Sequence, residues 1–532
     1  MTQNIDVVLS DTKPTLPPLS RRNFLQLAGL AGTAGAAALT GCHGKTAGGT
    51  GWMPDQYNDA GTFPVHSRGR VPIDVINPSI CRDDRKCILC GQCADVCNNA
   101  EAVMGHYELP LINDIPCVHC GQCTLWCPSG AITEVDDTDK VQSAIDNPDL
   151  TVIAHTAPST RIGLGEEFGL PPGTNVEGKQ VAALKALGFD TVFDTNFTAD
   201  LTITEEATEL VHRITGEKKA PLPQFTSCCP GWVKFCEYFY ADLIANLSSA
   251  KSPIGMIGPM IKTYYAEKAK LDPKKIVVVG VMPCTAKKYE AARPEMNSVG
   301  RYLKDPSIRD NDVIITTREL ARFIKKRNVD WEKLDPKTLY DKLLSAYSGG
   351  GAIFGATGGV MEAAVRSAYF YITKQNPPKE FLNMQPIRGL NGVKEDKFKL
   401  PVAGKETEVR IAVVTGLANA HVVLDQVRED VKSGTKEPRW HFIEFMACPG
   451  GCIAGGGQPK TSLPPSDSVR KARTGAIYSI DERMTLRLCH ENPEIVAIYK
   501  DFLGEPCSEK SEELLHTTYF DKSNLLVAKK KA

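Results

Sequence analysis

Two runs of four cysteines between residues 87 and 127 have the spacing of iron–sulfur ligands. The first run is Cys87-x2-Cys90-x2-Cys93-x3-Cys97, and the second is Cys117-x2-Cys120-x2-Cys123-x3-Cys127, followed by Pro128. In a doubled run of this kind, the fourth cysteine of each run binds the cluster of the other run. The spacing therefore predicts two four-iron clusters, one held by Cys87, Cys90, Cys93 and Cys127, and the other by Cys117, Cys120, Cys123 and Cys97.

The doubled run is typical of a bacterial-type ferredoxin module, a small α+β domain that we place at residues 76–148. A zinc site or a disulfide framework is the alternative for so many cysteines. Zinc, however, takes four ligands in paired C-x2-C units, whereas each of these runs holds four cysteines. Asn98 stands where the second run has Pro128, which weakens the local turn signal and leaves the number of ligands unchanged.

Further cysteines lie in three short motifs that are far apart in the chain. The motifs are TSCCPGW at 226–232, MPCTAKK at 282–288 and MACPGGC at 446–452. Thiolates suit soft iron–sulfur centres, and the proline or glycine near each cysteine lets the backbone approach a bulky inorganic core. The motifs predict a second metal site, whose cysteines the fold must bring together.

Beyond about residue 150 the chain alternates apolar runs with helical segments. We expect buried strands at 151–156, 191–194, 276–281, 313–316, 409–415 and 441–445, and a short strand at 224–225. This alternation predicts an α/β domain with largely parallel sheets at 149–465. Pro158, Cys229, Cys284 and Cys448 each follow one of these strands, and ligands beyond the carboxyl ends of such strands converge on one crevice.

These motifs resemble those of FeFe hydrogenases, and the resemblance extends from about Cys87 to the C-terminus. It implies an oxidoreductase that interconverts dihydrogen with two protons and two electrons. It implies the cofactor of that family, the H-cluster, in which a four-iron cluster is linked to a two-iron subcluster with CO, cyanide and a bridging dithiolate that carries an amine. The ligands it implies are Cys229, Cys284, Cys448 and Cys452, with Cys452 as the bridge between the two parts.

The resemblance also implies a path for protons. Cys228 matches the proton shuttle of the family, and the relay leading outward resembles Glu206, Ser248, Glu209 and Arg213. The residues that match those around the two-iron subcluster are Pro158, Ser159, Met282, Lys287, Phe354, Gly355 and Met446. A carboxylate buried on such a path would have its pKa raised by desolvation, which suits transient protonation near neutral pH.

Without the family, each of these residues has a simpler interpretation. A lone Cys228 would be a buried structural thiol, and Glu206 and Glu209 would form a solvated helix face. Lys287 would lie on the surface, and the methionines and Phe354 would fill the core. The position of Cys228 directly before a metal ligand in TSCCPGW favours the functional interpretation.

Length and composition fit a large multi-domain redox enzyme. The chain has 532 residues, 42% of them hydrophobic, and a net charge of −1. No long basic block precedes Lys529–Lys531, so we expect neither a nucleic acid nor a polybasic membrane patch. Besides the two domains above, we expect a linker at 43–75, a segment at 466–525 that resembles the separate small subunit of some exported relatives, and a basic tail at 526–532.

The first 42 residues have the features of a targeting segment. Ser20–Leu25 contains a twin-arginine pattern, and the weakly apolar stretch after it ends in a lipoprotein-like box with Cys42 as the acylated residue. Export by the twin-arginine translocase suits this chain, because metal inserted in the cytosol is kept only if the protein crosses in its folded state. Cleavage near Ala36–Ala38 and an uncleaved apolar anchor are the alternatives.

The predicted form is a monomeric, exported hydrogenase in the periplasm or on the outer face of the cytoplasmic membrane, attached through a lipid on Cys42. Its expected partners are dihydrogen and protons, a cytochrome or ferredoxin that accepts electrons during hydrogen uptake, and the FeFe hydrogenase maturation proteins. A hydrogenase-like iron–sulfur sensor or assembly protein without turnover is the alternative. A ferredoxin fused to a binding domain is a further one, but it would not need the cysteines of the three motifs.

Overall fold

The protein is described by a computed structural model that covers residues 69–104, 115–402, 404–435 and 437–526. The expected targeting segment (1–42), most of the expected linker (43–75) and the tail from residue 527 lie outside these ranges. Among the helices within them, none has the length and apolar character that crossing a membrane requires.

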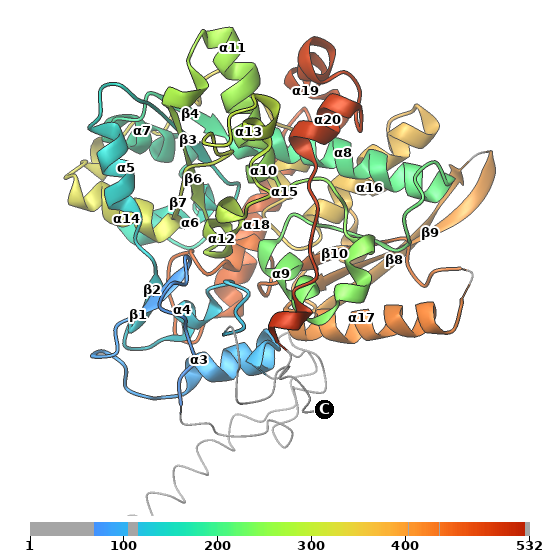
Figure 1. The fold of residues 1–532 in the computed structure, drawn as a ribbon, viewed down its shortest axis with the longest axis horizontal. Helices are drawn as coiled ribbons and strands as arrows, with labels where there is room; N and C mark the ends of the chain where they lie inside the picture. Colours follow the sequence, from blue (N-terminus) through green and yellow to red (C-terminus); the bar gives the residue numbers. More distant parts are fainter. Residues whose placement is uncertain (1–68, 105–114, 403, 436, 527–532) are drawn as a thin grey trace, which may run out of the picture. The chain divides into compact units, whose positions relative to one another are not determined.

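The two cysteine runs fold into one small unit (Figure 1). Its strands and helices are β1 (Ile80–Arg82), α3 (Gln92–Asp95), α4 (Gln122–Trp126) and β2 (Ile132–Glu134). The strands β1 and β2 pair antiparallel. Gly91 and Gly121 precede the two helices at equivalent positions and have φ values of 83° and 73°. Glycine adopts this left-handed conformation without steric cost, so the sequence repeat gives the same tight turn twice.

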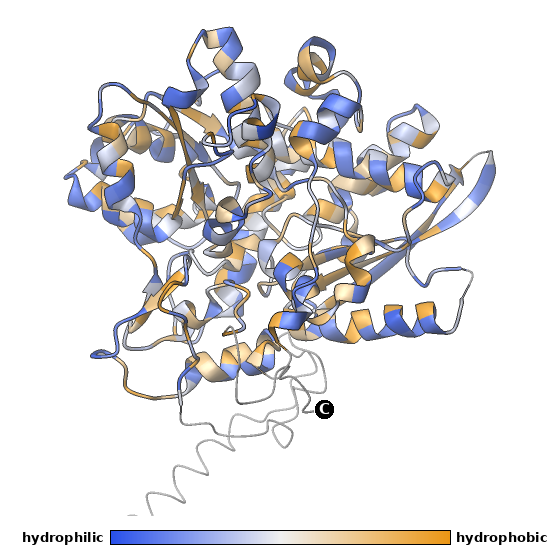
Figure 2. Cartoon of the chain, in the orientation of Figure 1, coloured by the Kyte–Doolittle hydropathy of each residue, from blue (hydrophilic) through white to orange (hydrophobic). Residues whose placement is uncertain are grey.

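Four parallel strands form a first sheet in the order β4-β3-β6-β7. They are β3 (Thr151–Thr156), β4 (Thr191–Asp194), β6 (Ile276–Met282) and β7 (Val313–Thr316). Both faces are covered by helices, namely α7 (Glu177–Leu187) and α14 (Thr317–Lys326) on one face, and α8 (Thr195–Thr215) and α10 (Pro253–Met260) on the other. Burial on both faces explains why these strands are nearly continuous apolar runs, as Figure 2 shows.

A second four-stranded sheet has the order β5-β10-β9-β8. It contains β5 (Gln224–Phe225), β8 (Val393–Val402), β9 (Lys405–Thr415) and β10 (Phe442–Met446). The strands β5, β10 and β9 are parallel, and β8 is antiparallel to β9. The sequence did not predict β8, because its residues VKEDKFKLPV alternate between exposed and buried and carry many charges. The helices α16 (Gly359–Thr373) and α17 (Leu417–Lys432) pack against this sheet.

The long helix α8 links the two sheets. It contacts α10, which packs on the first sheet, and α16, which packs on the second. The C-terminal helices then cover this region, and they are α18 (Asp467–Arg483), α19 (Pro493–Ile498) and α20 (Glu509–Leu515). Of these, α18 packs on α15 (Gly349–Ile353), α19 on α8, and α20 on α10. The C-terminal segment therefore helps to shield α8, most of whose residues are buried.

Candidate metal centre and proton relay

The eight cysteines of the two runs line two separate cavities. One cavity is lined by Cys87, Cys90, Cys93 and Cys127. The other is lined by Cys97, Cys117, Cys120 and Cys123. The fourth cysteine of each run thus lies with the first three of the other run, which is the arrangement that two four-iron clusters need.

The second cavity is the one that faces the large α/β domain. The Gln122 side-chain amide donates to the Ala454 carbonyl oxygen at 2.8 Å, and the Thr285 hydroxyl donates to the His119 carbonyl oxygen at 2.6 Å. The first cavity reaches the surface, because Cys90 is exposed. The two cysteine sets therefore form a path from the surface to the interior of the protein.

The cysteines of the three motifs converge where strands of both sheets end. Cys229 follows β5, Cys284 follows β6, and Cys448 and Cys452 follow β10. The Ala447 N–H donates to Cys229 Sγ at 3.3 Å. Burial raises the pKa of all four thiols, to about 12 for Cys284. Thiols placed together and away from water are weak acids, whereas a metal deprotonates them on binding, so the set suits thiolate ligation of a cluster.

Pro158, Ser159 and Gly355 form a wall beside these cysteines. The Ser159 hydroxyl donates to the Gly355 carbonyl oxygen at 3.4 Å, and the Ile453 N–H donates to the same oxygen at 3.0 Å. A β-carbon on Gly355 would lie 2.7 Å from Ser159 Oγ. Glycine is therefore needed for this close approach, which joins the end of β3 to the residue that follows Cys452.

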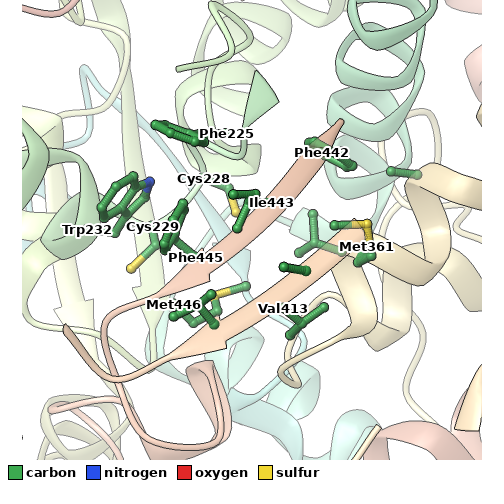
Figure 3. Close-up of a cluster of buried hydrophobic side chains, with 14 of the residues drawn as sticks. Phe225, Cys228, Cys229, Trp232, Met361, Val413, Phe442, Ile443, Phe445 and Met446 are labelled. Atoms are coloured by element: carbon green, nitrogen blue, oxygen red, sulfur yellow. The ribbon is translucent and has the colours of Figure 1, made fainter. Parts of the chain in front are cut away.

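Apolar side chains surround the same place. Met282 and Met446 are the last residues of β6 and β10, so they lie where two of the cysteine loops begin. Both methionines and Phe354 are buried. Figure 3 shows Met446 in the same buried cluster as Cys229 and Trp232. These side chains exclude water from the cysteine site.

Lys287 carries a buried positive charge next to Cys228. Its Nζ donates to the Cys228 carbonyl oxygen at 2.9 Å and pairs with Glu290 at 2.6 Å. Burial alone would lower the pKa of Lys287, but the Glu290 carboxylate raises it, so the ammonium stays charged. A charged donor in this position suits an anionic ligand such as cyanide.

Cys228 and Glu206 form the inner end of the expected relay. Neither carboxyl oxygen of Glu206 makes a hydrogen bond of normal geometry within the described residues, although the residue is only 1% exposed. Burial, followed by the charges of Glu209 and Glu444, raises its pKa well above the ordinary value. Burial and the proximity of Glu206 also raise the pKa of the Cys228 thiol. Both groups therefore hold a proton at neutral pH.

Glu209, one turn further along α8, is held by several donors. Its Oε2 accepts from the Ser248 hydroxyl at 2.7 Å, and its Oε1 accepts from Arg213 at 2.7 Å and from Lys218 at 2.9 Å. Burial alone would raise its pKa, but the charges of Arg213 and Lys218 lower it to about 2. The expectation that burial raises the pKa of a carboxylate on the path thus holds for Glu206 and is wrong for Glu209, where two cations outweigh desolvation.

A family model described as "Iron only hydrogenase large subunit, C-terminal domain" matches residues 150–456, and one described as "Iron hydrogenase small subunit" matches residues 467–522. The chain belongs to the FeFe hydrogenase family. It is 44% identical to the NADP-reducing hydrogenase subunit HndD of Solidesulfovibrio fructosivorans, over 85% of this chain and 76% of that protein. It is 47% identical to the periplasmic Fe hydrogenase large subunit of Nitratidesulfovibrio vulgaris, over 71% of this chain and 85% of that protein.

A solved structure is similar as well. The FeFe hydrogenase HydA1 from Chlamydomonas reinhardtii superposes with a TM-score of 0.63 at 37% sequence identity, covering 73% of this chain and 99% of that chain. The protein is thus an oxidoreductase of the FeFe hydrogenase type, and its family implies the H-cluster and iron–sulfur clusters as cofactors. The four thiols, of which Cys229, Cys284 and Cys448 are buried, and the buried carboxyl group of Glu206 fit this cofactor chemistry.

Three polar residues beside the expected relay were not predicted from the sequence. They are Lys218, Ser249 and His516, which connect to one another and to Glu209. Ser249 directly follows the predicted relay residue Ser248, and His516 is the titratable residue within LLHTT. The two residues are 267 positions apart in the chain. Only the pairing of Ala250 with His516 in the folded protein brings them together.

Proposed function

We propose that this hydrogenase interconverts dihydrogen with two protons and two electrons. One observation carries the proposal, namely that the proton-bearing pair Cys228 and Glu206 adjoins the four-thiol site that begins at Cys229. The chemistry needs an electron conduit, a metal and a general acid within reach of it. The chain supplies thiolate ligands and the acid at neighbouring positions.

Cys229, Cys284, Cys448 and Cys452 would hold the four-iron part of the H-cluster, with Cys452 bridging to the two-iron part. When bound, the cofactor supplies the open metal position at which dihydrogen is formed or split. The protein's own residues have three tasks around it. The buried wall and methionines exclude water, Lys287 offers a positive charge to anionic ligands, and Cys228 holds a proton at the inner end of the relay.

The relay would carry that proton outward along Cys228, Glu206, Ser248, Glu209 and Arg213. The Ser248–Glu209–Arg213 part is continuous in hydrogen bonds, with contacts of 2.7 Å on either side of the carboxylate. Glu206 has the raised pKa and Glu209 the lowered one, so the inner carboxyl group holds the proton more tightly, and transfer outward to Glu209 is uphill.

Electrons would pass through two four-iron clusters in the ferredoxin module. The separate cavities lined by the two cysteine sets support this part of the proposal. The set that includes Cys90 is open to the surface and would exchange electrons with a cytochrome or another redox partner. The set that includes Cys120 adjoins the hydrogenase domain and would exchange electrons with the H-cluster.

The proposal extends to an exported enzyme that takes up hydrogen. The twin-arginine pattern at Arg21–Arg22 and the box that ends at Cys42 support export by the twin-arginine translocase and a lipid anchor. The relative from Nitratidesulfovibrio vulgaris is named as periplasmic, which is consistent with this location. The FeFe hydrogenase maturation proteins would load the cofactor before export.

Infrared spectroscopy of the purified protein tests the proposal. A hydrogenase should show bands of metal-bound CO and cyanide and turn over dihydrogen. An assembly protein, as the alternative, would hold iron–sulfur clusters without those bands. A sensor without turnover would show the bands and no catalytic rate.

A further inference from the structure

Ser249, which the proposed relay does not include, lies between the relay carboxylate Glu209 and a histidine of the C-terminal segment. Its hydroxyl oxygen is 3.4 Å from Glu209 Oε2, 3.1 Å from Lys218 Nζ and 2.9 Å from His516 Nδ1. The backbone fixes this arrangement, because the Thr517 N–H donates to the Ser249 carbonyl oxygen at 2.9 Å. A polar bridge therefore joins the relay to the C-terminal segment.

The far side of the His516 ring decides which of its nitrogens can lose a proton. His516 Nε2 lies 2.9 Å from Glu205 Oε2. Burial alone would raise the pKa of Glu205, but hydrogen bonds from His516, Ser511 and Tyr499 lower it, so the group is a carboxylate that only accepts. Nε2 therefore keeps its proton, and deprotonation leaves Nδ1 bare and facing Ser249.

Two arrangements of the Ser249 hydroxyl follow from this geometry. The Lys218 ammonium can only donate, so it occupies one lone pair of Ser249 Oγ. When His516 is charged, Nδ1 donates to the other lone pair, and the hydroxyl proton must point to Glu209. When Nδ1 is bare, it accepts the hydroxyl proton at the shorter distance of 2.9 Å, and Glu209 loses a donor.

We propose that His516 is a positioning residue that makes the outer carboxylate of the proton relay respond to pH through Ser249. In its protonated form, the histidinium turns the Ser249 hydroxyl onto Glu209 and stabilises the ionised carboxylate. In its neutral form, the ring withdraws the hydroxyl, and Glu209 accepts a proton more readily. This inference rests on the relay in the proposed function.

Charged and titratable groups from several elements surround His516. Glu205 of α8 and Cys507 before α20 each place an atom within 4.8 Å of the ring, and the Glu512 carbonyl oxygen of α20 accepts from the His516 N–H. Glu209 and Lys218 connect to the ring through Ser249, and Tyr499 after α19 and Tyr371 of α16 interact with Glu205. Burial raises the pKa of both tyrosines and of the Cys507 thiol, and the pKa values of Glu205 and Glu209 are lowered. The imidazole is the group in this cluster that ordinarily changes charge between about pH 5 and 8.

The experiment compares two variants of the loaded enzyme that fix the hydroxyl in opposite ways. In His516→Gln the side chain still reaches Glu205 but offers Ser249 no acceptor at the Nδ1 position, so the hydroxyl stays on Glu209. In Ser249→Ala the hydroxyl is gone, so Glu209 is permanently without this donor. His212→Gln, on the solvent side of α8, serves as the control for loss of a histidine.

The readouts are the pH profile of hydrogen turnover and the infrared band of the ionised Glu209 carboxylate, which Glu209→Gln identifies by its loss. In acid, we expect His516→Gln to turn over hydrogen as fast as the unmodified enzyme. At alkaline pH, we expect its turnover to be about three- to tenfold lower than that of the unmodified enzyme, which is the effect of one hydrogen bond. In acid, we expect Ser249→Ala to turn over hydrogen faster than the unmodified enzyme by a similar factor. The double variant should behave like Ser249→Ala alone.

A His516→Gln enzyme that keeps its iron and follows the unmodified profile at every pH would overturn the proposal. A shift of both variants in the same direction would overturn it too. The relay itself is tested separately by Glu206→Gln, because unchanged turnover in that variant would refute the proposed path for protons rather than the role of His516.

Discussion

Glu206 lies close enough to Cys228 to raise the pKa of its thiol, yet neither of its own carboxyl oxygens makes a hydrogen bond of normal geometry within the described residues. A buried polar group left without partners costs about 1–3 kcal/mol of folding stability. The burial of this carboxyl group is therefore not offset by a hydrogen bond of normal geometry among the described residues. Positions of this kind are where function, rather than stability, determines the residue.

Glu206→Gln should therefore lower turnover while leaving the fold intact. Glutamine keeps the size of the side chain but cannot take up and release a proton. Because general acid–base steps typically contribute roughly 10²–10⁴ in rate, we expect a loss of that order in hydrogen assays. The thermal midpoint, the iron content and the CO and cyanide bands should persist. Activity within about twofold of the unmodified enzyme would mean that protons take another route.

The crossed cysteine sets predict which substitutions resemble each other. Cys97→Ser should disturb the same cluster as Cys117→Ser, although Cys97 belongs to the first run, because these residues line one cavity. Cys127→Ser should resemble Cys87→Ser for the same reason. Electron paramagnetic resonance of the reduced variants would compare the pairs. If Cys97→Ser instead resembled Cys87→Ser, each run would hold its own cluster.

Part of this architecture could be predicted from the sequence because local pattern determined it. The strands β3, β4 and β7 have the expected bounds, since each is an apolar run buried on both faces. The division of the strands between two sheets could not be predicted, because it depends on which runs pair across long distances. The contact between Ser249 and His516 could not be predicted for the same reason, because no local sequence pattern links the two residues.

Glu134 should stabilise the contact between the cysteine unit and α14 in a pH-dependent way. It pairs with Arg318 and with Arg322, the latter at 2.6 Å. Burial alone would raise its pKa, but these charges lower it from 4.5 to about 2. The folded-state pKa is thus below the unfolded value, so the stabilisation is present above about pH 4.5 and is lost as the pH falls toward 2.

Glu134→Gln removes this electrostatic contribution to the free energy of unfolding, which is on the order of 3 kcal/mol at neutral pH. Thermal midpoints measured from pH 7 downward should differ between the two proteins near neutrality, and the difference should narrow below about pH 4.5. Asp139→Asn is the matched control, because its pair with Lys326 is exposed and contributes little. A difference that stays constant down to low pH would contradict the electrostatic explanation.

The mature N-terminus should begin at an acylated Cys42. Several acyl chains on one residue hold a protein firmly at a membrane, whereas one chain alone binds with only about 10⁴ M⁻¹. Mass spectrometry of the purified protein would identify the first residue and its modification. An unmodified terminus far from Cys42 would contradict the lipid anchor and leave export itself standing, and replacement of Arg21 and Arg22 by lysine would test export separately.

Cys228 and Cys229 are adjacent, but we expect their substitutions to have different effects. Cys229→Ala removes a thiolate ligand, so the four-iron part of the H-cluster should assemble poorly and the CO and cyanide bands should weaken with the activity. Cys228→Ala removes only the proton-bearing thiol beside Glu206, so the bands and the iron content should survive while turnover nearly stops. The clusters of the ferredoxin module should be intact in both variants. A Cys228→Ala enzyme with normal turnover, or one without its iron, would show that the roles of the two cysteines are assigned wrongly.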